Sequence, residues 1–431
     1  MRKIIRTTMI IALLLCLALC LFSCKGKDEP TVDSSLVDRF DLTRQVLNFI
    51  NTTYYGDLDY DLVDIYTAYG LIGSLGPYNY INNIADSLAS SSDGKGFGLI
   101  IRSTKYNERY IDSILEGSPF LTQSNGYLPA RGDEIKAIDG NRIEGLDSDI
   151  YSEYIATIPS DREVTFTLEH DGETHEVSYQ KVAFEFPYCI YVDDLEGVPS
   201  DFGYIWLRSF TLTKNHKTED EFREAVKAFN RDGNRALILD LRGNGGGSST
   251  VLSTVASALI GENVPVGTNL VEVQYEKKGY SSFVRATAAE YRIDTPIYVL
   301  CDGKTASASE ALIGTMKAHG TLTALIGQPT VGKGVAQNGT DDSLEDSVGY
   351  FIDKAQDENG EEQKAGAYFV QVIVGKYYII DPSAEGGKYC MHEQPFVPDI
   401  PVSGENVISE DYGEDIYIRA AIEDYNGKLS Q

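Results

Sequence analysis

The sequence predicts a multidomain α+β protein, for three reasons. The chain has 431 residues, more than a single hydrophobic core ordinarily serves, so two or three domains are expected. Its apolar spacing changes along the chain, from a helical repeat to short alternating strands and then to buried strands that alternate with helices. With 42% hydrophobic and 10% aromatic residues, the chain has enough apolar surface to form several cores.

The net charge excludes some classes of partner. The chain carries 65 acidic and 37 basic side chains, for a formal net charge of -28. Nucleic-acid phosphates need a face rich in lysine and arginine, so we expect no nucleic-acid partner. Attraction to anionic lipid headgroups is disfavoured for the same reason, and the acidic surface is interpreted as solubilising.

Residues 1–23 predict a signal peptide. Basic residues precede an uninterrupted apolar run from Met9 to Phe22, which as a helix is shorter than the ~30 Å hydrocarbon core of a membrane. The run ends in LFSC at residues 21–24, which resembles a bacterial lipobox, so Cys24 is the predicted lipidation site. Cleavage elsewhere, with Cys24 an ordinary cysteine, is the alternative.

A polar tether and a small helical domain are expected next. Residues 24–35 are polar and short of apolar side chains, and residues 36–93 are predicted to form an N-terminal helical domain. Apolar residues between Val37 and Ile50 recur at helical spacing. A second helix is expected from Tyr60 to Ile72, and the segment GSLGPYNY at 73–80 ends it. No chemistry is apparent in this domain.

Residues 94–183 are predicted to form a β domain. GFGLII at 96–101 is a glycine-rich loop that enters a strand, and DG pairs mark two hairpin turns further on. These segments, with GDEIKAIDGNRI at 132–143, resemble a PDZ domain; the alternative is a β domain of no particular family. The resemblance implies that the loop holds a peptide carboxylate while the peptide adds to a sheet edge. The implied peptide-binding residues are Gly96, Phe97, Gly98 and Leu99.

Residues 184–431 change to an α/β pattern. Buried-looking strands are expected at 203–207, 236–241, 296–300 and 322–327, alternating with helices near 218–230, 249–260 and 307–318. Residues 338–366 are acidic and glycine-rich, which indicates an exposed insertion, and the chain then returns to strand at 367–380.

The first chemical signal is DLRGNGGGSS at 240–249, where a strand ends before a helix. A dinucleotide-binding GxGxxG motif fails here because Ser248 stands at the third glycine position. Glycines let main-chain amides approach a ligand oxygen, as an oxyanion hole requires. A tight turn with a purely structural role is the alternative.

The second signal is TASASE at 305–310, which follows a strand and begins a helix. Small neighbours leave the hydroxyl of Ser307 accessible, and a helix N-terminus favours developing negative charge. Ordinary N-capping by Ser307 is the alternative.

The third signal is GQPTVGKG at 327–334. It fits part of a nucleotide-binding P-loop, but Gly334 stands where a hydroxyl for magnesium is required, so nucleotide binding is not expected. Lys333 is then either a surface lysine or has another role. None of the five histidines lies in a motif that would support a classical triad with Ser307. A lysine whose pKa is lowered by burial can serve as the base instead.

In series, the PDZ-like segment, DLRGNGGG, TASASEAL and PTVGKGVAQ strongly resemble the carboxyl-terminal processing proteases of the S41 serine peptidase family, from Leu36 to about Val402. The resemblance implies an α/β catalytic core of the ClpP/crotonase-like type at 184–431. It also implies that Ser307 is the nucleophile, Lys333 the general base and Gln337 the residue that orients the lysine amine. The implied oxyanion hole combines the amide of Ala308 with that of Gly246, and Gly247 is left open.

We therefore expect an exported endopeptidase that cleaves polypeptides near accessible C-termini by Ser–Lys acyl transfer, without metal or cofactor. Lipidation would attach it to the bacterial cell envelope, at the outer membrane, facing the periplasm or the outside. A catalytically inactive peptide-binding lipoprotein of the same fold is the alternative. The sequence leaves open the oligomeric state and whether Cys189 and Cys390 form a disulfide.

Overall fold

The structure is a computed structural model of the chain. It describes residues 45–47, 49–50, 60–83, 95–104, 106–192, 194–212, 218–338, 350–356, 362–404 and 408–430. The chain divides into two compact units, Met1–Ala68 and Tyr69–Gln431. The predicted signal peptide, Cys24 and the tether lie outside the described residues. Among those described, no helix combines the length and apolar character that a membrane span needs.

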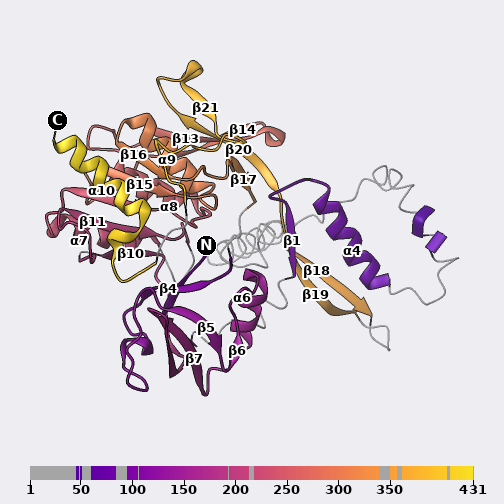
Figure 1. Ribbon diagram of the computed structural model, residues 1–431. Helices are drawn as coiled ribbons and strands as arrows, with labels where there is room; N and C mark the ends of the chain where they lie inside the picture. Colours follow the sequence, from indigo (N-terminus) through magenta and orange to yellow (C-terminus); the bar gives the residue numbers. More distant parts are fainter. Residues whose placement is uncertain are drawn as a thin grey trace, which may run out of the picture. The chain divides into compact units, whose positions relative to one another are not determined.

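A six-stranded sheet forms the centre of the second unit (Figure 1). Its strands, in spatial order, are β10 (Cys189–Val192), β11 (Phe202–Leu207), β12 (Ala236–Asp240), β15 (Ile297–Cys301), β16 (Leu322–Gly327) and β22 (Ile400–Pro401). Neighbours from β11 to β22 pair in parallel, and β10 is antiparallel at one edge. The helices of this core are α7 (Thr218–Arg231), α8 (Ser249–Leu259), α9 (Ala308–His319) and α10 (Ile416–Leu429). The predicted strands and helices of the α/β region are thus present, with ends displaced by a residue or two.

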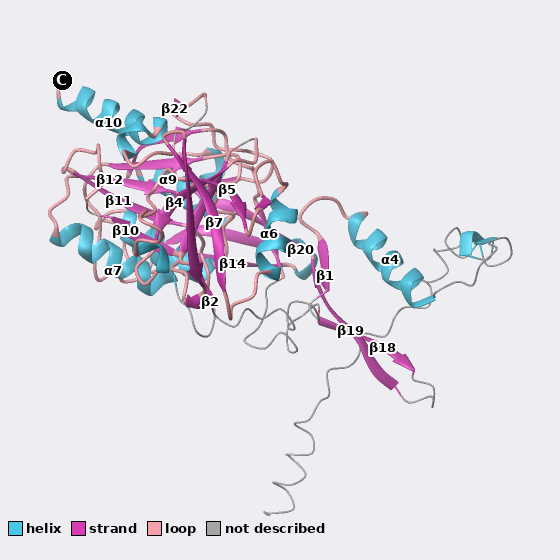
Figure 2. Cartoon of the chain, turned by 60° about the horizontal axis from the view of Figure 1, so that its bottom comes forward, coloured by secondary structure: helices cyan, strands magenta, loops and turns pink. Residues whose placement is uncertain are grey.

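Each face of this sheet is covered, because alternate side chains of a strand point to opposite faces. Ile205 and Leu207 pack on one face with the apolar residues of α7, α8 and α9. Phe202, Tyr204 and Trp206 pack on the other, mainly with residues of α10. The sheet is therefore a middle layer, with α7 on one side and α10 on the other (Figure 2). The loops that precede α8 and α9 leave the carboxyl ends of β12 and β15.

A second sheet packs beside the core and carries the residues after α9. Its order is β14 (Tyr280–Arg285), β13 (Asn269–Tyr275), β20 (Ile373–Ile380) and β17 (Val335–Gln337), with β21 (Lys388–Cys390) paired to β20. Gln337 ends β17, and Lys333 lies in the loop that enters it. The short 3-10 helices are η2 (Pro119–Leu121), η3 (Glu276–Lys278), η5 (Glu385–Gly387) and η6 (Tyr412–Glu414).

A third sheet departs from the sequence prediction in two respects. It has the order β1 (Tyr80–Asn83), β19 (Glu362–Gln371) and β18 (Tyr350–Gln356). The region predicted as a helical domain contains the expected helix, α4 (Tyr60–Gly73), but also the strand β1. The predicted insertion at 338–366 is in part a β hairpin rather than a loop. The hairpin escaped prediction because charged and polar residues interrupt the apolar positions of its strands, and strand pairing through the main chain does not require apolar side chains.

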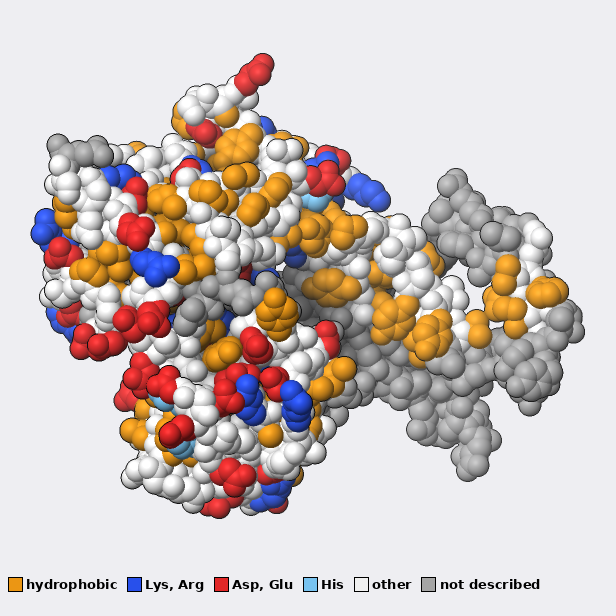
Figure 3. Space-filling view, viewed as in Figure 1, with side chains coloured by type: hydrophobic (Ala, Val, Ile, Leu, Met, Phe, Trp, Pro, Cys, Tyr) orange, Lys and Arg blue, Asp and Glu red, His pale blue; other side chains and the backbone are white. Residues whose placement is uncertain are grey.

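Residues 95–183 form a β module with its own core. The sheet order is β3 (Leu99–Ser103), β4 (Arg109–Ile114), β5 (Glu134–Ile138), β7 (Glu163–His170) and β8 (Glu173–Gln180), and β6 (Asn141–Arg142) pairs with β5. The helix α6 (Ser148–Thr157) completes it, and β2 (Lys95–Gly96) pairs with β9 (Val182–Ala183). Acidic and basic side chains are interspersed over this module on the face shown in Figure 3. Within the described residues, β3 is an edge strand whose second edge pairs with no other strand.

Three described cysteines, Cys189, Cys301 and Cys390, are free thiols. Cys189 lies in the central sheet and Cys390 in the sheet of β20, so no disulfide joins the two sheets in this structure.

Candidate active site

Ser307 occupies a strained turn between β15 and α9. Its backbone dihedrals are φ 59° and ψ -116°, a region that side-chain-bearing residues rarely adopt. Three hydrogen bonds hold the residues around this turn. The main-chain N–H of Ala306 and the hydroxyl of Ser309 both donate to the carbonyl of Asn244, each at 3.0 Å. The hydroxyl of Thr305 donates to the carbonyl of Leu241. A sharp strand-to-helix turn of this kind projects a serine hydroxyl away from the sheet, as nucleophile elbows do.

The glycine loop after β12 lies directly against this serine. A Cβ atom added to Gly246 would stand 2.7 Å from the main-chain nitrogen of Ala308 and 2.8 Å from Cβ of Ser307. Because φ of Gly246 is +99°, only glycine suits both the space and the conformation. The two predicted oxyanion segments are therefore adjacent in space.

The amides of this loop are not equivalent. The N–H of Gly246 donates to Oδ1 of the buried Asn244 at 2.9 Å. Among the described residues, no acceptor is found for the N–H groups of Gly247 and Ala308. In this conformation the open donors beside Ser307 are therefore those of Ala308 and Gly247, while Gly246 provides the close approach.

Glu310 joins the serine turn to the lysine loop. Its side chain is 1% exposed, and its Oε2 accepts the main-chain N–H of Ser307 at 2.9 Å and that of Lys333 at 2.8 Å. Its Oε1 accepts the hydroxyl of Thr330 and the N–H of Gly332, both at 2.6 Å. One buried carboxylate thus holds the two predicted catalytic segments together.

Lys333 and Gln337 form a hydrogen-bonded pair. Nζ of Lys333 donates to Oε1 of Gln337 at 2.8 Å. Burial lowers the pKa of Lys333 below that of an ordinary lysine, and the negative charge of Glu310 opposes part of that decrease. Within the described part of the chain, no hydrogen bond joins Nζ to the hydroxyl of Ser307, a contact that often tightens only once substrate is bound.

Tyr78 is a residue of this site that the sequence prediction missed. The Nε2 amide of Gln337 donates to the main-chain carbonyl of Tyr78 at 2.6 Å, and Nζ of Lys333 lies 5.3 Å from the centre of the Tyr78 ring. Tyr78 is more than 250 residues away in sequence and belongs to a segment that looked like a helix breaker. Only its proline and glycine neighbours, which mark a fixed turn, could have drawn attention to it.

A buried charge network anchors the start of the glycine loop. Arg242, 6% exposed, binds Asp240 through Nε and Nη2 and binds Asp415 through Nη1 at 2.8 Å. From the β module, Arg102 bonds to Asp112 at 2.9 Å and lies 3.8 Å from Asp240. Burial alone would raise the pKa of Asp112, but the neighbouring guanidinium groups outweigh it and hold that pKa below its usual range.

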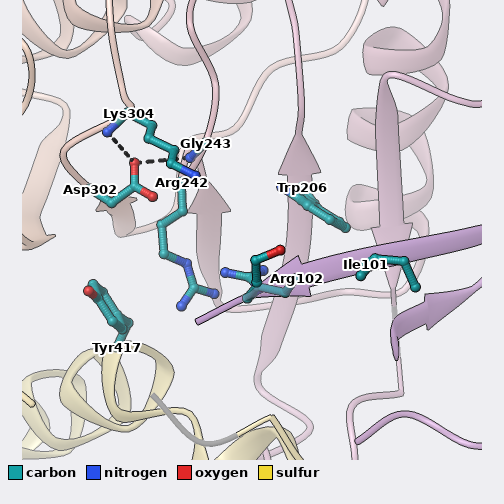
Figure 4. A pocket seen from close by; sticks show the side chains of 9 residues that line it. Ile101, Arg102, Trp206, Arg242, Gly243, Asp302, Lys304 and Tyr417 are labelled. Atoms are coloured by element: carbon teal, nitrogen blue, oxygen red, sulfur yellow. Dashed lines mark hydrogen bonds between the residues drawn. The ribbon is translucent and has the colours of Figure 1, made fainter. Parts of the chain in front are cut away.

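A cavity of about 310 Å³ is lined in part by the arginines of this network (Figure 4). The edge strand β3 supplies Ile101, Arg102 and Ser103 to its wall, and the core supplies residues that include Trp206, Arg242 and Lys304. In Figure 4 the side chains of Arg102 and Arg242 lie next to each other, and the carboxylate of Asp302 accepts the N–H groups of Gly243 and Lys304. The cavity is thus flanked by the free edge of the module and by the loops that lead to Ser307.

The predicted peptide-binding loop begins this same edge. Gly98 has φ +63°, and a Cβ there would lie 2.7 Å from the ring of Phe184. The carbonyl of Gly98 is bonded to Leu115, whereas the N–H groups of Phe97 and Gly98 find no acceptor among the described residues. These two amides are available to a carboxylate. The structure does not bring this loop into contact with Ser307.

Comparisons with known proteins find similarity to one family of peptidases. Residues 201–367 match the model of the family described as Peptidase family S41. "Carboxy-terminal processing protease CtpA" of Bacillus subtilis is 27% identical over 72% of this chain and 63% of its own length. "Probable CtpA-like serine protease" of Staphylococcus saprophyticus is 24% identical over 76% of this chain and 64% of its own length.

A solved structure shows the same fold. The crystal structure of a putative S41 protease from Bacteroides fragilis superposes with a TM-score of 0.52 and 15% identity, covering 82% of this chain and 87% of that chain. The present chain spans slightly less than two thirds of the length of the two curated relatives.

Proposed function

We propose that this chain, a member of peptidase family S41, is a serine endopeptidase that cleaves polypeptides near their C-termini. The proposal depends on one observation: the main-chain N–H groups of Ser307 and Lys333 both donate to the carboxylate of Glu310. Ser307 stands in a strained turn with the amide of Ala308 open beside it, and the pKa of Lys333 is lowered by burial. These are a half-buried nucleophile, an oxyanion donor and a base that can be neutral.

In the proposed mechanism, neutral Lys333 takes the proton from the hydroxyl of Ser307 as its oxygen attacks the scissile carbonyl. The negative charge that develops on the carbonyl oxygen is stabilised by the N–H groups of Ala308 and of a loop glycine, Gly247 or Gly246. The ammonium of Lys333 then protonates the departing amine, which leaves an ester on Ser307. Water, deprotonated by the same lysine, releases the acyl product and restores the serine.

Substrate delivery follows from the edge strand of the β module. A peptide whose carboxylate binds the amides of Phe97 and Gly98 could pair with β3, because that edge is free among the described residues. Antiparallel pairing would direct the upstream chain along β3, past the cavity at Arg102 and toward the serine loop. We propose this PDZ-type capture as the reason for cleavage near C-termini.

The test compares purified wild type with Ser307→Ala and Lys333→Ala on a substrate protein that carries a flexible apolar tail. We expect both variants to lose cleavage while keeping the fluorescence of the single tryptophan, Trp206, which reports on the core sheet. Removing the tail carboxylate by amidation should raise KM. Binding of the tail by wild type without hydrolysis would instead identify a peptide-binding protein.

We further propose that the protein is exported and attached to the bacterial cell envelope through a lipid on Cys24. The support is the apolar run and the LFSC segment of the sequence. Labelling cells with a fatty-acid analogue should tag the wild-type protein and leave Cys24→Ala untagged. An equally labelled Cys24→Ala protein would contradict the assignment of the anchor.

A further inference from the structure

A segment far from the catalytic motifs reaches the lysine–glutamine pair. The main-chain carbonyl of Tyr78 accepts the amide N–H of Gln337 at 2.6 Å, and the Tyr78 ring faces Nζ of Lys333 at 5.3 Å. Both the base and its partner are therefore in contact with one residue that precedes the β module.

The contact to Gln337 determines how its amide is oriented. A glutamine side chain ends in one acceptor oxygen and one donor NH2 group. Because the NH2 end is bound to the carbonyl of Tyr78, the oxygen end faces the amine of Lys333. Without that carbonyl, the amide could rotate and present its NH2 group to the lysine, which is a donor facing a donor.

The segment around Tyr78 is itself held in place. Tyr78 has φ +69°, a left-handed conformation, in a turn that Pro77 precedes. The side chain of Asn79 donates to carbonyls of this turn, including that of Pro77 at 3.2 Å, and its Oδ1 accepts the N–H of Ile373 at 2.9 Å. The next residue, Tyr80, begins β1 and pairs with β19. The turn is therefore fixed to the strand that leads into β20, beside Gln337.

We propose that Tyr78 is a positioning residue for the general base, supplied by the turn at 76–80. Its carbonyl sets the orientation of Gln337, and its ring excludes water from one side of the Lys333 amine. This inference rests on the proposed Ser–Lys mechanism. It assigns a catalytic purpose to a region whose sequence shows no chemistry.

The charges around the amine give the sign of the expected pH effect. Lys333 is influenced by burial, which lowers its pKa, and by Glu310, which raises it. Its amine also bonds to Gln337 and lies against the ring of Tyr78, and the side chain of Tyr80 bonds to Gln337; none of these three side chains carries a charge at neutral pH. Removing the Tyr78 ring would admit water to the amine, so its pKa should rise toward the ordinary lysine value.

The experiment compares Tyr78→Ala with Tyr78→Phe and Asn79→Ala in the full chain. We expect kcat of Tyr78→Ala to fall by about 10- to 100-fold, as for a misplaced catalytic group, with KM little changed. The acid limb of its kcat/KM profile should move to higher pH. Tyr78→Phe should keep wild-type rates, because no hydrogen bond of the Tyr78 hydroxyl occurs among the described residues. Asn79→Ala should lower kcat through looser placement of the turn.

The outcomes separate this inference from the proposed function. If Ser307→Ala cleaves as well as wild type, the mechanism itself fails. If Ser307→Ala is inactive but Tyr78→Ala keeps the wild-type kcat and pH profile, the role of the Tyr78 ring is overturned. The alanine variant keeps the main-chain carbonyl, so the orientation of Gln337 is tested by Asn79→Ala, and an unchanged kcat in that variant overturns it. Should Tyr78→Ala fail to fold, judged by Trp206 fluorescence, Asn79→Ala decides: an unchanged kcat and pH profile in that variant also overturns the inference.

Discussion

Replacing Glu310 by glutamine tests the central geometric feature of the site. The carboxylate accepts four hydrogen bonds from groups that are buried or partly buried, two on each oxygen. Glutamine has nearly the same shape, but one of its two ends is an NH2 group that cannot accept. Whichever end takes that place, two donors of the native structure lose their acceptor.

The size of the effect follows from those bonds. A hydrogen bond to a charged group contributes about 1.5–3 kcal/mol, so losing two should reduce the free energy of unfolding by about 3–6 kcal/mol. The pH dependence of catalysis should change as well. The charge of Glu310 raises the pKa of Lys333, so its removal should lower that pKa further. The acid limb of the kcat/KM profile should then move to lower pH, opposite to the shift expected for Tyr78→Ala.

Urea unfolding, followed by the fluorescence of Trp206, measures the change in the free energy of unfolding. Glu224→Gln is the matched control, because Glu224 is an exposed helix residue whose ion pair with Lys227 should contribute little to stability. If Glu310→Gln were as stable as this control and its acid limb stayed in place, the carboxylate would not hold the two segments together, and the reasoning would be refuted.

Three further predictions concern the base, the glycine loop and the buried ion pairs. Wild-type kcat/KM should rise with pH as Lys333 loses its proton, with a midpoint below the pKa of an ordinary lysine; a flat profile would argue against a lysine base. Gly246→Ala should abolish cleavage, because its Cβ would stand 2.7 Å from the nitrogen of Ala308. Gly245→Ala, which faces open space, should retain most activity in the same assay. Arg242→Met should lower the free energy of unfolding by about 3–5 kcal/mol, because it leaves the buried Asp415 without this partner and Asp240 with only the more distant Arg102; urea titration measures it.

The sequence allowed the α/β region to be predicted closely, because its strands are apolar runs bounded by helix-start residues. ALILDL at 236–241 and PIYVL at 296–300 each lie within one residue of an observed strand. Fully buried parallel strands require such runs, so the pattern is strong. The hairpin of β18 and β19 is different: main-chain pairing holds it, and its acidic, glycine-rich sequence predicted only an exposed insertion.

The local motifs of the site could be predicted, but the contacts between them could not. Ser307 and Lys333 each lie in a short segment with distinctive neighbours. The bonds of Glu310 to the lysine loop could not be predicted, because they depend on how two distant segments fold together. Tyr78 contributes a main-chain carbonyl, which every residue has. No residue type marks such a role, so only the fold reveals it.

Ser307 has a backbone conformation that costs roughly 1–3 kcal/mol, so several contacts with its surroundings must hold it in place. Two buried charged groups contribute to this: Glu310 ties the turn to the lysine loop, and Arg242 fixes the strand end from which the glycine loop leaves. Buried ion pairs add little net stability compared with apolar packing, so stability alone does not explain charges here. A buried carboxylate or guanidinium instead makes several hydrogen bonds of fixed direction, which hold neighbouring segments in one geometry. An apolar side chain of equal volume would fill the space but leave the turn free to relax, and the serine would lose its alignment with the open amides.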